Sequence, residues 1–161
     1  MMATLGSFTT GQILSAAEMN KILPMTVVRL TAVLSIATAV QTVLPWAAGS
    51  ELADDLNWHN DVTNNSRITP TIAGLYLVQA AATYAANGGV GDYIRILLNG
   101  ATYADNAANH AATGANSGLA LATLVVCNGT TDYLELAIYQ NSGGAINVNN
   151  RQLSVALIRK T

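Results

Sequence analysis

The sequence predicts an all-β protein: a ten-stranded antiparallel jelly-roll sandwich with a short N-terminal arm that contains one short helix. Three observations favour this fold class. No stretch after residue 26 shows helical periodicity. Short runs rich in Val, Ile, Leu, Thr and Tyr alternate apolar with polar or small residues. Turn signals separate these runs at short intervals, and about ten short strands joined by such turns are typical of a β-sandwich.

The arm comprises residues 1–25 and the sandwich domain residues 26–161. Ser15-Ala-Ala-Glu18 is a capping box, in which the serine oxygen accepts a hydrogen bond from a helix N-terminal amide. The predicted helix runs from Ser15 to Leu23, and Pro24 ends it. A helix of about two turns has little stability alone. The arm is therefore expected either to fray or to dock on its own domain, a neighbouring subunit or a larger assembly. The residues expected to make that contact are Leu14, Met19 and Ile22.

The run from Arg67 to Ala86 predicts a strand in the middle of the domain. Pro70 and Gly74 interrupt its first part, almost no charge follows, and the run ends at the turn signal 87–89. Both faces of this strand are apolar or small, whereas a strand with one solvated face alternates with polar residues. We expect cover on both faces, the second cover being another copy of the protein.

The alternation is clearest in two later runs, 133–139 and 152–157. In the first run, one face carries Leu134, Leu136 and Ile138, and Tyr133, Glu135, Ala137 and Tyr139 lie opposite. Asn99-Gly100 is the signal for a two-residue hairpin between 93–98 and 101–104. Separate strands are also predicted at 145–148 and 151–160. Two further strands are predicted near 26–36 and 39–46. This reading is favoured over a membrane span at 30–48, because that stretch contains Thr, Ser, Gln and Pro.

Composition excludes several classes of function. Charged residues make up 10% of the chain and its net charge is -2, so there is no basic field for nucleic acid. Cys127 is the one cysteine, and its apolar neighbours predict a buried, inert thiol. No catalytic residues, cofactor or metal site are predicted, and the chain is not expected to be an enzyme.

Two polar features are candidate sites. His59 and His110 lie far apart in sequence and lack zinc-ligand spacing, so both are interpreted as solvated loop residues. Asp54, Asp55 and Asp61 lie around Trp58 and His59, in the densest polar cluster of the chain. Calcium is the alternative there, but the spacing is not that of a calcium loop, and a solvated loop capping the sandwich is preferred.

Residues 26–161 contain a series of short motifs in a recognisable order. They are Trp46, Asn65-Ser-Arg67, Thr69-Pro70, Gly74-Leu-Tyr76, Leu98-Asn-Gly100, Asp132-Tyr-Leu-Glu-Leu136, Tyr139-Gln-Asn-Ser142 and Leu153-Ser-Val-Ala-Leu157. Their order resembles the jelly roll shared by tumour necrosis factor and the globular head of the first complement component. That resemblance implies a homotrimer in which one sheet of each subunit packs around the threefold axis. The expected threefold contacts are Tyr76, Ala137 and Tyr139.

Residues 8–20 resemble the opening of many bacteriophage structural and tail-associated proteins. The collagen stalk of the complement relatives and the long repeats of many tail fibres are absent from this sequence. Together these resemblances imply a virion protein: a head decoration or cement protein that trimerises, binds the major capsid protein or another virion protein, and stabilises the shell. It would be made in the host cytoplasm, lie on the particle surface, and bind neither nucleic acid nor membrane. The alternative is a tail-fibre or baseplate module that grips host carbohydrate through loops 86–92 and 105–118.

Overall fold

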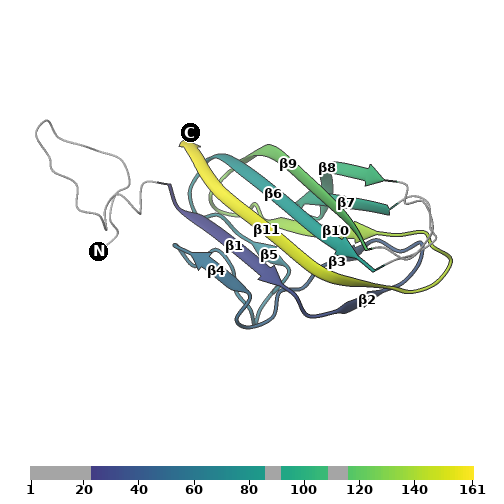
Figure 1. Ribbon diagram of the computed structural model, residues 1–161. Helices are drawn as coiled ribbons and strands as arrows, with labels where there is room; N and C mark the ends of the chain where they lie inside the picture. Colours follow the sequence, from purple (N-terminus) through teal and green to yellow (C-terminus); the bar gives the residue numbers. More distant parts are fainter. Residues whose placement is uncertain (1–22, 86–91, 109–115) are drawn as a thin grey trace, which may run out of the picture.

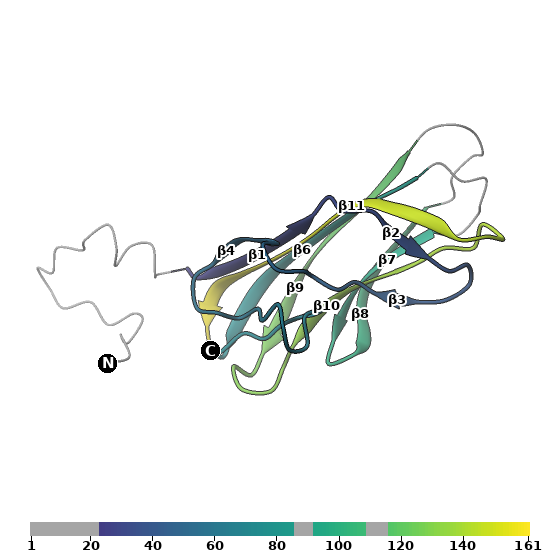
Figure 2. The same cartoon turned by 90° about the horizontal axis from the view of Figure 1, so that it is seen from below.

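The computed structural model describes residues 23–85, 92–108 and 116–161, and over these ranges it contains strands but no helix. The strands form two antiparallel sheets stacked face to face (Figures 1 and 2). The predicted all-β antiparallel sandwich is therefore confirmed. The predicted helix lies outside the described residues, apart from its last residue, Leu23.

The first layer, called here the β11 sheet, has the strand order β4-β1-β11-β6-β9, and β2 also pairs with β11. Its strands are β1 (Met25–Leu30), β2 (Leu34–Ile36), β4 (Glu51–Asp54), β6 (Gly74–Tyr84), β9 (Ser117–Cys127) and β11 (Ile146–Lys160). The second layer, the β10 sheet, has the order β3-β10-β7-β8, with β5 also paired to β10. Its strands are β3 (Thr42–Val43), β5 (Arg67–Ile68), β7 (Asp92–Leu98), β8 (Ala101–Ala108) and β10 (Leu134–Tyr139).

The predicted central strand is β6, which lies between β11 and β9 inside its sheet (Figure 1). The number of strands differs from the expected ten, since the described residues form eleven. The short strand β4 has no counterpart among the predicted strands, whereas β5 occupies the start of the run from Arg67 to Ala86, before Pro70. Two runs predicted as separate strands, 145–148 and 151–160, join into the single strand β11, with an irregularity between Val148 and Asn150.

The segment 30–48, for which a membrane span was the alternative, forms strand ends, β2, β3 and the loops between them. Among the described residues, no helix has the length and apolar character needed to cross a bilayer.

The core lies between the two sheets, and its largest fully buried side chains include three aromatic ones, Trp46, Tyr76 and Tyr84. The rings of Trp58 and Tyr76 meet edge to face, with their centroids 5.6 Å apart. Tyr76 donates its hydroxyl hydrogen to the carbonyl of Ile72, and Tyr84 donates to the carbonyl of Tyr93. Burial of these phenols is thus matched by hydrogen bonds, which avoids the cost of unpaired polar atoms in the interior.

Candidate functional site

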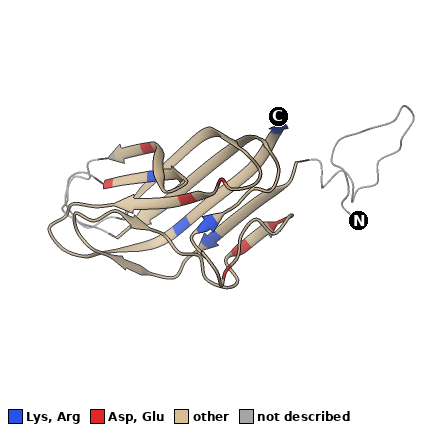
Figure 3. Ribbon diagram, turned by 180° about the vertical axis from the view of Figure 1, so that it is seen from behind, with Lys and Arg blue, Asp and Glu red and all other residues tan. Residues whose placement is uncertain are grey.

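The candidate functional site is the outward face of the β11 sheet, the face turned away from the core. In β6, alternate side chains from Tyr76 to Tyr84 are buried between the sheets, which leaves Leu75, Leu77, Gln79 and Ala81 on the outward face. The four long strands β1, β11, β6 and β9 contain no Asp or Glu. In Figure 3 the red acidic segments lie over the β10 sheet and around β4.

Strand register sets the composition of this outward face, row by row across the sheet. One row joins four apolar residues: Met25 pairs with Ala156, Ala156 with Leu77, and Leu77 with Leu124. The next outward row is small or uncharged and runs Val27, Ser154, Gln79 and Ala122. The third row is Arg29, Gln152, Ala81 and Ala120. One part of the face is therefore bulky and apolar, and the adjoining part is built mostly of small and amide side chains, with Arg29 at its β1 end.

The bulky part is open to solvent in the single chain. Leu124 is 49% exposed, Val126 57%, Ile158 46% and Met25 38%. Isolated exposed apolar residues are ordinary, but a contiguous group across neighbouring strands marks an interaction surface. The small-residue part forms an open hollow of about 320 Å³. The residues lining this hollow include Gln79, Ala81, Ala120, Ala122 and Gln152.

The β10 sheet differs in character on its outward side. Arg95 lies 3.9 Å from Asp105, and Arg67 lies 3.4 Å from Glu135. The Arg95–Asp105 pair is partly exposed, so it is screened by water and costs little to solvate. Glu135 is buried, and Arg67 and the hydroxyl of Ser66 satisfy its carboxylate. The contrast between the two faces makes the β11 sheet the better candidate for a permanent contact.

The structure does not bring the three expected threefold contacts together. Tyr76 is on the β11 sheet but points into the core, with 0% of its surface exposed. Ala137 and Tyr139 belong to β10, in the other sheet, where Ala137 is also fully buried. The Tyr139 ring packs edge to face on Tyr93, 5.7 Å away. Tyr76 and Ala137 thus offer a partner no surface of the folded chain, and the outward-facing Leu77 and Leu124 are better placed for such a contact.

The three expected arm contacts, Leu14, Met19 and Ile22, lie outside the described residues.

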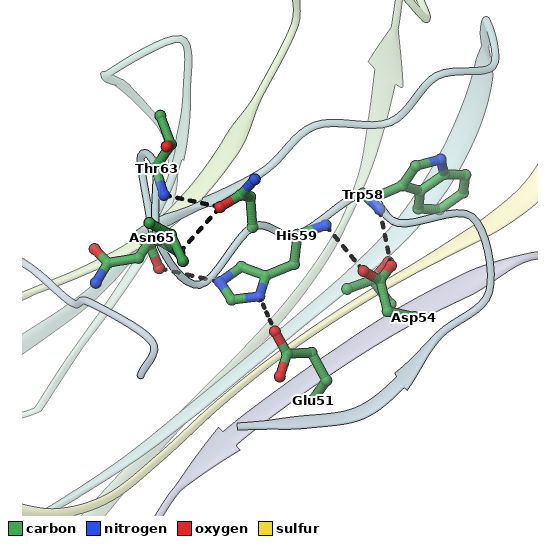
Figure 4. A network of polar contacts seen from close by, with 9 residues as sticks. Glu51, Asp54, Trp58, His59, Thr63 and Asn65 are labelled. Carbon is green, nitrogen blue, oxygen red and sulfur yellow. Dashed lines mark hydrogen bonds and ion pairs between the residues drawn. The ribbon is translucent and has the colours of Figure 1, made fainter. Parts of the chain in front are cut away.

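The polar cluster around His59 is organised differently from the expectation. The prediction that His59 is solvated is wrong, since its side chain has 0% exposure. The ring Nδ1 lies 2.5 Å from a carboxylate oxygen of Glu51, and Nε2 lies 3.2 Å from the carbonyl oxygen of Asn65 (Figure 4). The chain's other histidine, His110, is outside the described residues.

The carboxylate of Asp54, in the same cluster, is hydrogen-bonded to other parts of the chain. Its carboxylate accepts hydrogen bonds from the backbone amides of Trp58 and His59 and from the hydroxyl of Thr26. These donors occupy the oxygens that a cation would use. Within the described ranges, no group of three or more His, Cys, Asp or Glu side chains is arranged to hold a metal ion.

Cys127 is buried, as expected, with 1% of its surface exposed. Burial, with a further contribution from Asp132, raises the pKa of its thiol to about 12. The sulfur is therefore protonated at neutral pH and is a poor nucleophile.

No protein-family model and no curated protein matches this chain. Solved structures do match its fold. Eiger TNF from S. frugiperda superposes with a TM-score of 0.56 at 12% identity, covering 86% of this chain and 95% of that one. Murine APRIL superposes with a TM-score of 0.55 at 12% identity, covering 83% of this chain and 99% of that one.

A third match is part of a larger protein, the dimeric latent PorU from Porphyromonas gingivalis. It has a TM-score of 0.52 at 9% identity, and the aligned region covers 84% of this chain but 13% of PorU. At these identities the likeness shows the fold alone. The described chain is a jelly-roll sandwich similar to that of tumour necrosis factor-like proteins.

Proposed function

We propose that this chain is a non-enzymatic structural subunit that forms a homotrimer through the outward face of the β11 sheet. We further propose that the trimer is a decoration or cement protein on the head of a bacteriophage. The observation that carries the first step is the exposed, acid-free face of β1, β11, β6 and β9. Its fold likeness to tumour necrosis factor-like proteins supports a trimer, because the family resemblance implies one sheet of each subunit around a threefold axis.

Burying this face has a clear energetic benefit. Apolar surface removed from water contributes roughly 25 cal/mol per Å². An obligate interface buries on the order of 2,000 Å² or more. Leu124, Val126 and Met25 would move from water into that contact, and few charges would need to be desolvated with them. Stability would then belong to the trimer, so the melting temperature would depend on protein concentration.

The second step, attachment to a phage head, is supported by the resemblance of residues 8–20 to the openings of phage structural proteins. In this proposal the arm binds the major capsid protein or another virion protein through Leu14, Met19 and Ile22. Each such contact is weak, but three arms on one trimer bind together and raise the overall affinity. The subunit would be made in the host cytoplasm and would reside on the particle surface.

Binding to phage capsids that lack their decoration protein tests this step. Deleting residues 1–22 leaves β1 intact, because β1 begins at Met25. The intact chain is expected to bind capsids saturably, and the truncated chain is expected to stay trimeric but lose capsid binding. If the truncated trimer bound as tightly as the intact one, the arm would have no role in attachment. If neither bound capsids but the intact trimer bound host glycans, a receptor-binding function would replace the one proposed.

A further inference from the structure

We propose that Asn99 is a deamidation site that the fold keeps closed, and that its conversion to aspartate releases the turn between β7 and β8 from the 128–133 loop. The proposal rests on the hydrogen bonds that join Asn99 to Asp132 and Tyr133. It does not depend on the proposed function.

The chemistry follows from the pair Asn99-Gly100. Glycine has no Cβ, so its backbone nitrogen is open to approach by the preceding side chain. The nitrogen of Gly100 bonds to Cγ of Asn99 and loses its hydrogen, while the bond from Cγ to Nδ2 breaks and ammonia leaves. Water then hydrolyses the cyclic imide at one of its carbonyl groups, which gives aspartate or isoaspartate. Water is the co-reactant, and nothing is oxidised or reduced.

The sequence contains three Asn-Gly pairs, of which 99–100 and 128–129 lie in the ranges that the structure describes. Asn99 and Gly100 form the exposed tip of the hairpin between β7 and β8, where their φ angles are +54° and +78°. Water therefore reaches this pair, and its exposure alone would leave it open to deamidation.

The carboxamide of Asn99 is hydrogen-bonded at both ends. Its Nδ2 donates to Oδ1 of Asp132 at 2.8 Å, and its Oδ1 accepts from the backbone amide of Tyr133 at 3.0 Å. The backbone amide of Asn99 also donates to the carbonyl of Tyr133 at 3.0 Å. These three hydrogen bonds, called here the Asn99 clasp, join the hairpin tip to the 128–133 loop.

The acceptor in this clasp is itself held in place by its own loop. Oδ2 of Asp132 accepts a hydrogen bond from the backbone amide of Asn128 at 2.7 Å. Oδ1 of Asn128 in turn accepts from the backbone amides of Thr130, Thr131 and Asp132. The Asp132 carboxylate is thus positioned by the loop before Asn99 contacts it.

The clasp closes the site because the reaction needs a different geometry. Cγ of Asn99 has to turn onto the nitrogen of Gly100, and both hydrogen bonds of the carboxamide break when it does so. The backbone resists as well, since Leu98 and Ala101 are paired on either side of the turn. Deamidation therefore proceeds from a locally opened state, and its rate falls with the population of that state.

Conversion to aspartate destroys the clasp. It replaces Nδ2 by an oxygen that has no hydrogen to donate at neutral pH, at the position 2.8 Å from Oδ1 of Asp132. Two carboxylates at this separation repel each other. Isoaspartate also lengthens the backbone within the turn, which disturbs the pairing of Leu98 with Ala101. Because the ammonia is lost to solvent, neither product returns to asparagine.

The first experiment exchanges the two clasp side chains. Asn99→Asp makes the product directly and is expected to lower the melting temperature by about 2–4 °C. Adding Asp132→Asn is expected to restore most of this loss. The introduced amide can donate to the new carboxylate, and its oxygen can still accept from the backbone amide of Asn128. A single variant as stable as the wild type, or a double variant no more stable than the single one, would overturn the proposal.

The second experiment measures deamidation itself, from the mass of the peptide that contains Asn99 and Gly100 after incubation in mildly alkaline buffer. The folded wild type is expected to react at least about tenfold more slowly than the chain in denaturant. Asp132→Ala removes the acceptor of Asn99 Nδ2 and is expected to raise the rate in the folded chain several-fold.

Thr131→Ala is the matched control in the same loop. It removes the acceptor of Asn128 Nδ2 and leaves the Asn99 clasp intact, so its rate at Asn99 is expected to equal that of the wild type. All variants are compared below their melting temperatures, with circular dichroism to show that each is folded. Equal rates for the folded and denatured wild type, or Asp132→Ala reacting no faster than Thr131→Ala, would contradict the proposal.

Discussion

Leu77 of β6 and Leu124 of β9 are direct partners in the antiparallel ladder, and both side chains lie on the outward face of the β11 sheet. Leu124 is 49% exposed in the single chain. The pair lies in the row that also contains Met25 and Ala156. An apolar row of this kind across four strands is the part of the molecule that gains most from contact with another copy.

Replacing Leu124 with Lys is expected to weaken self-association by at least about tenfold, because the new charge would have to be desolvated at the contact. Sedimentation equilibrium measures this shift. Val40→Lys is the control, since Val40 is 52% exposed and lies in the loop between β2 and β3. Equal association of Leu124→Lys and wild type would place the contact elsewhere.

Tyr76→Phe is expected to reduce the free energy of unfolding by about 1–3 kcal/mol, because the carbonyl of Ile72 loses its donor while the ring can still pack on Trp58. Denaturant titration at one protein concentration measures the change. The control is Tyr103→Phe, whose hydroxyl donates to the carbonyl of Leu124 at an exposed site and should cost about 0.5 kcal/mol or less. Equal costs for the two variants would argue against a buried role for the Tyr76 hydroxyl.

Gly129→Ala is expected to destabilise the chain by about 2–5 kcal/mol. The added Cβ would lie 2.3 Å from the backbone nitrogen of Ala73, and Gly129 has a φ of +73°. Gly143→Ala is the matched control, because Gly143 also has a positive φ but has no atom within 4 Å of the added Cβ. The difference between the two unfolding free energies isolates the steric term, and no difference would mean that the Gly129 turn can move away freely.

Cys127 is expected to react with a thiol reagent at least about a hundredfold more slowly in the folded chain than in denaturant at pH 8. Burial is the main cause of its raised pKa, about 12, so the reactive thiolate is scarce in the folded state. The time course of labelling, followed by intact-protein mass, gives both rates. Native labelling as fast as denatured labelling would show that β9 opens readily at its end.

Local features of the fold are predictable from the sequence, because short-range residue chemistry determines them. Asn99 and Gly100 both adopt positive φ in the turn between β7 and β8, as the Asn-Gly signal predicts. The alternation of Leu134, Leu136 and Ile138 likewise predicts β10, and these side chains are fully buried. The short strand β4 is not predicted, because its four residues show no measurable periodicity.

Features that depend on distant parts of the chain are not predictable in this way. Alternation separates the two faces of β6 but does not show which face meets the core. The sequence alone therefore predicts Tyr76 as a contact with another copy, whereas its ring packs on Trp58 in the core. The sequence predicts a solvated His59, because no sequence signal marks Glu51 or Asn65 as a partner of its ring. The acid-free character of the outward face emerges only when β1, β11, β6 and β9 are assigned to one sheet.

The mass of the chain in solution at micromolar concentration decides whether the outward face of the β11 sheet is an interface between copies. One subunit has a mass of 16.7 kDa. Light scattering coupled to size-exclusion chromatography is expected to give three times that mass for the wild type. A single species at the subunit mass would rule out the trimer, because the outward face of the β11 sheet would then remain in water.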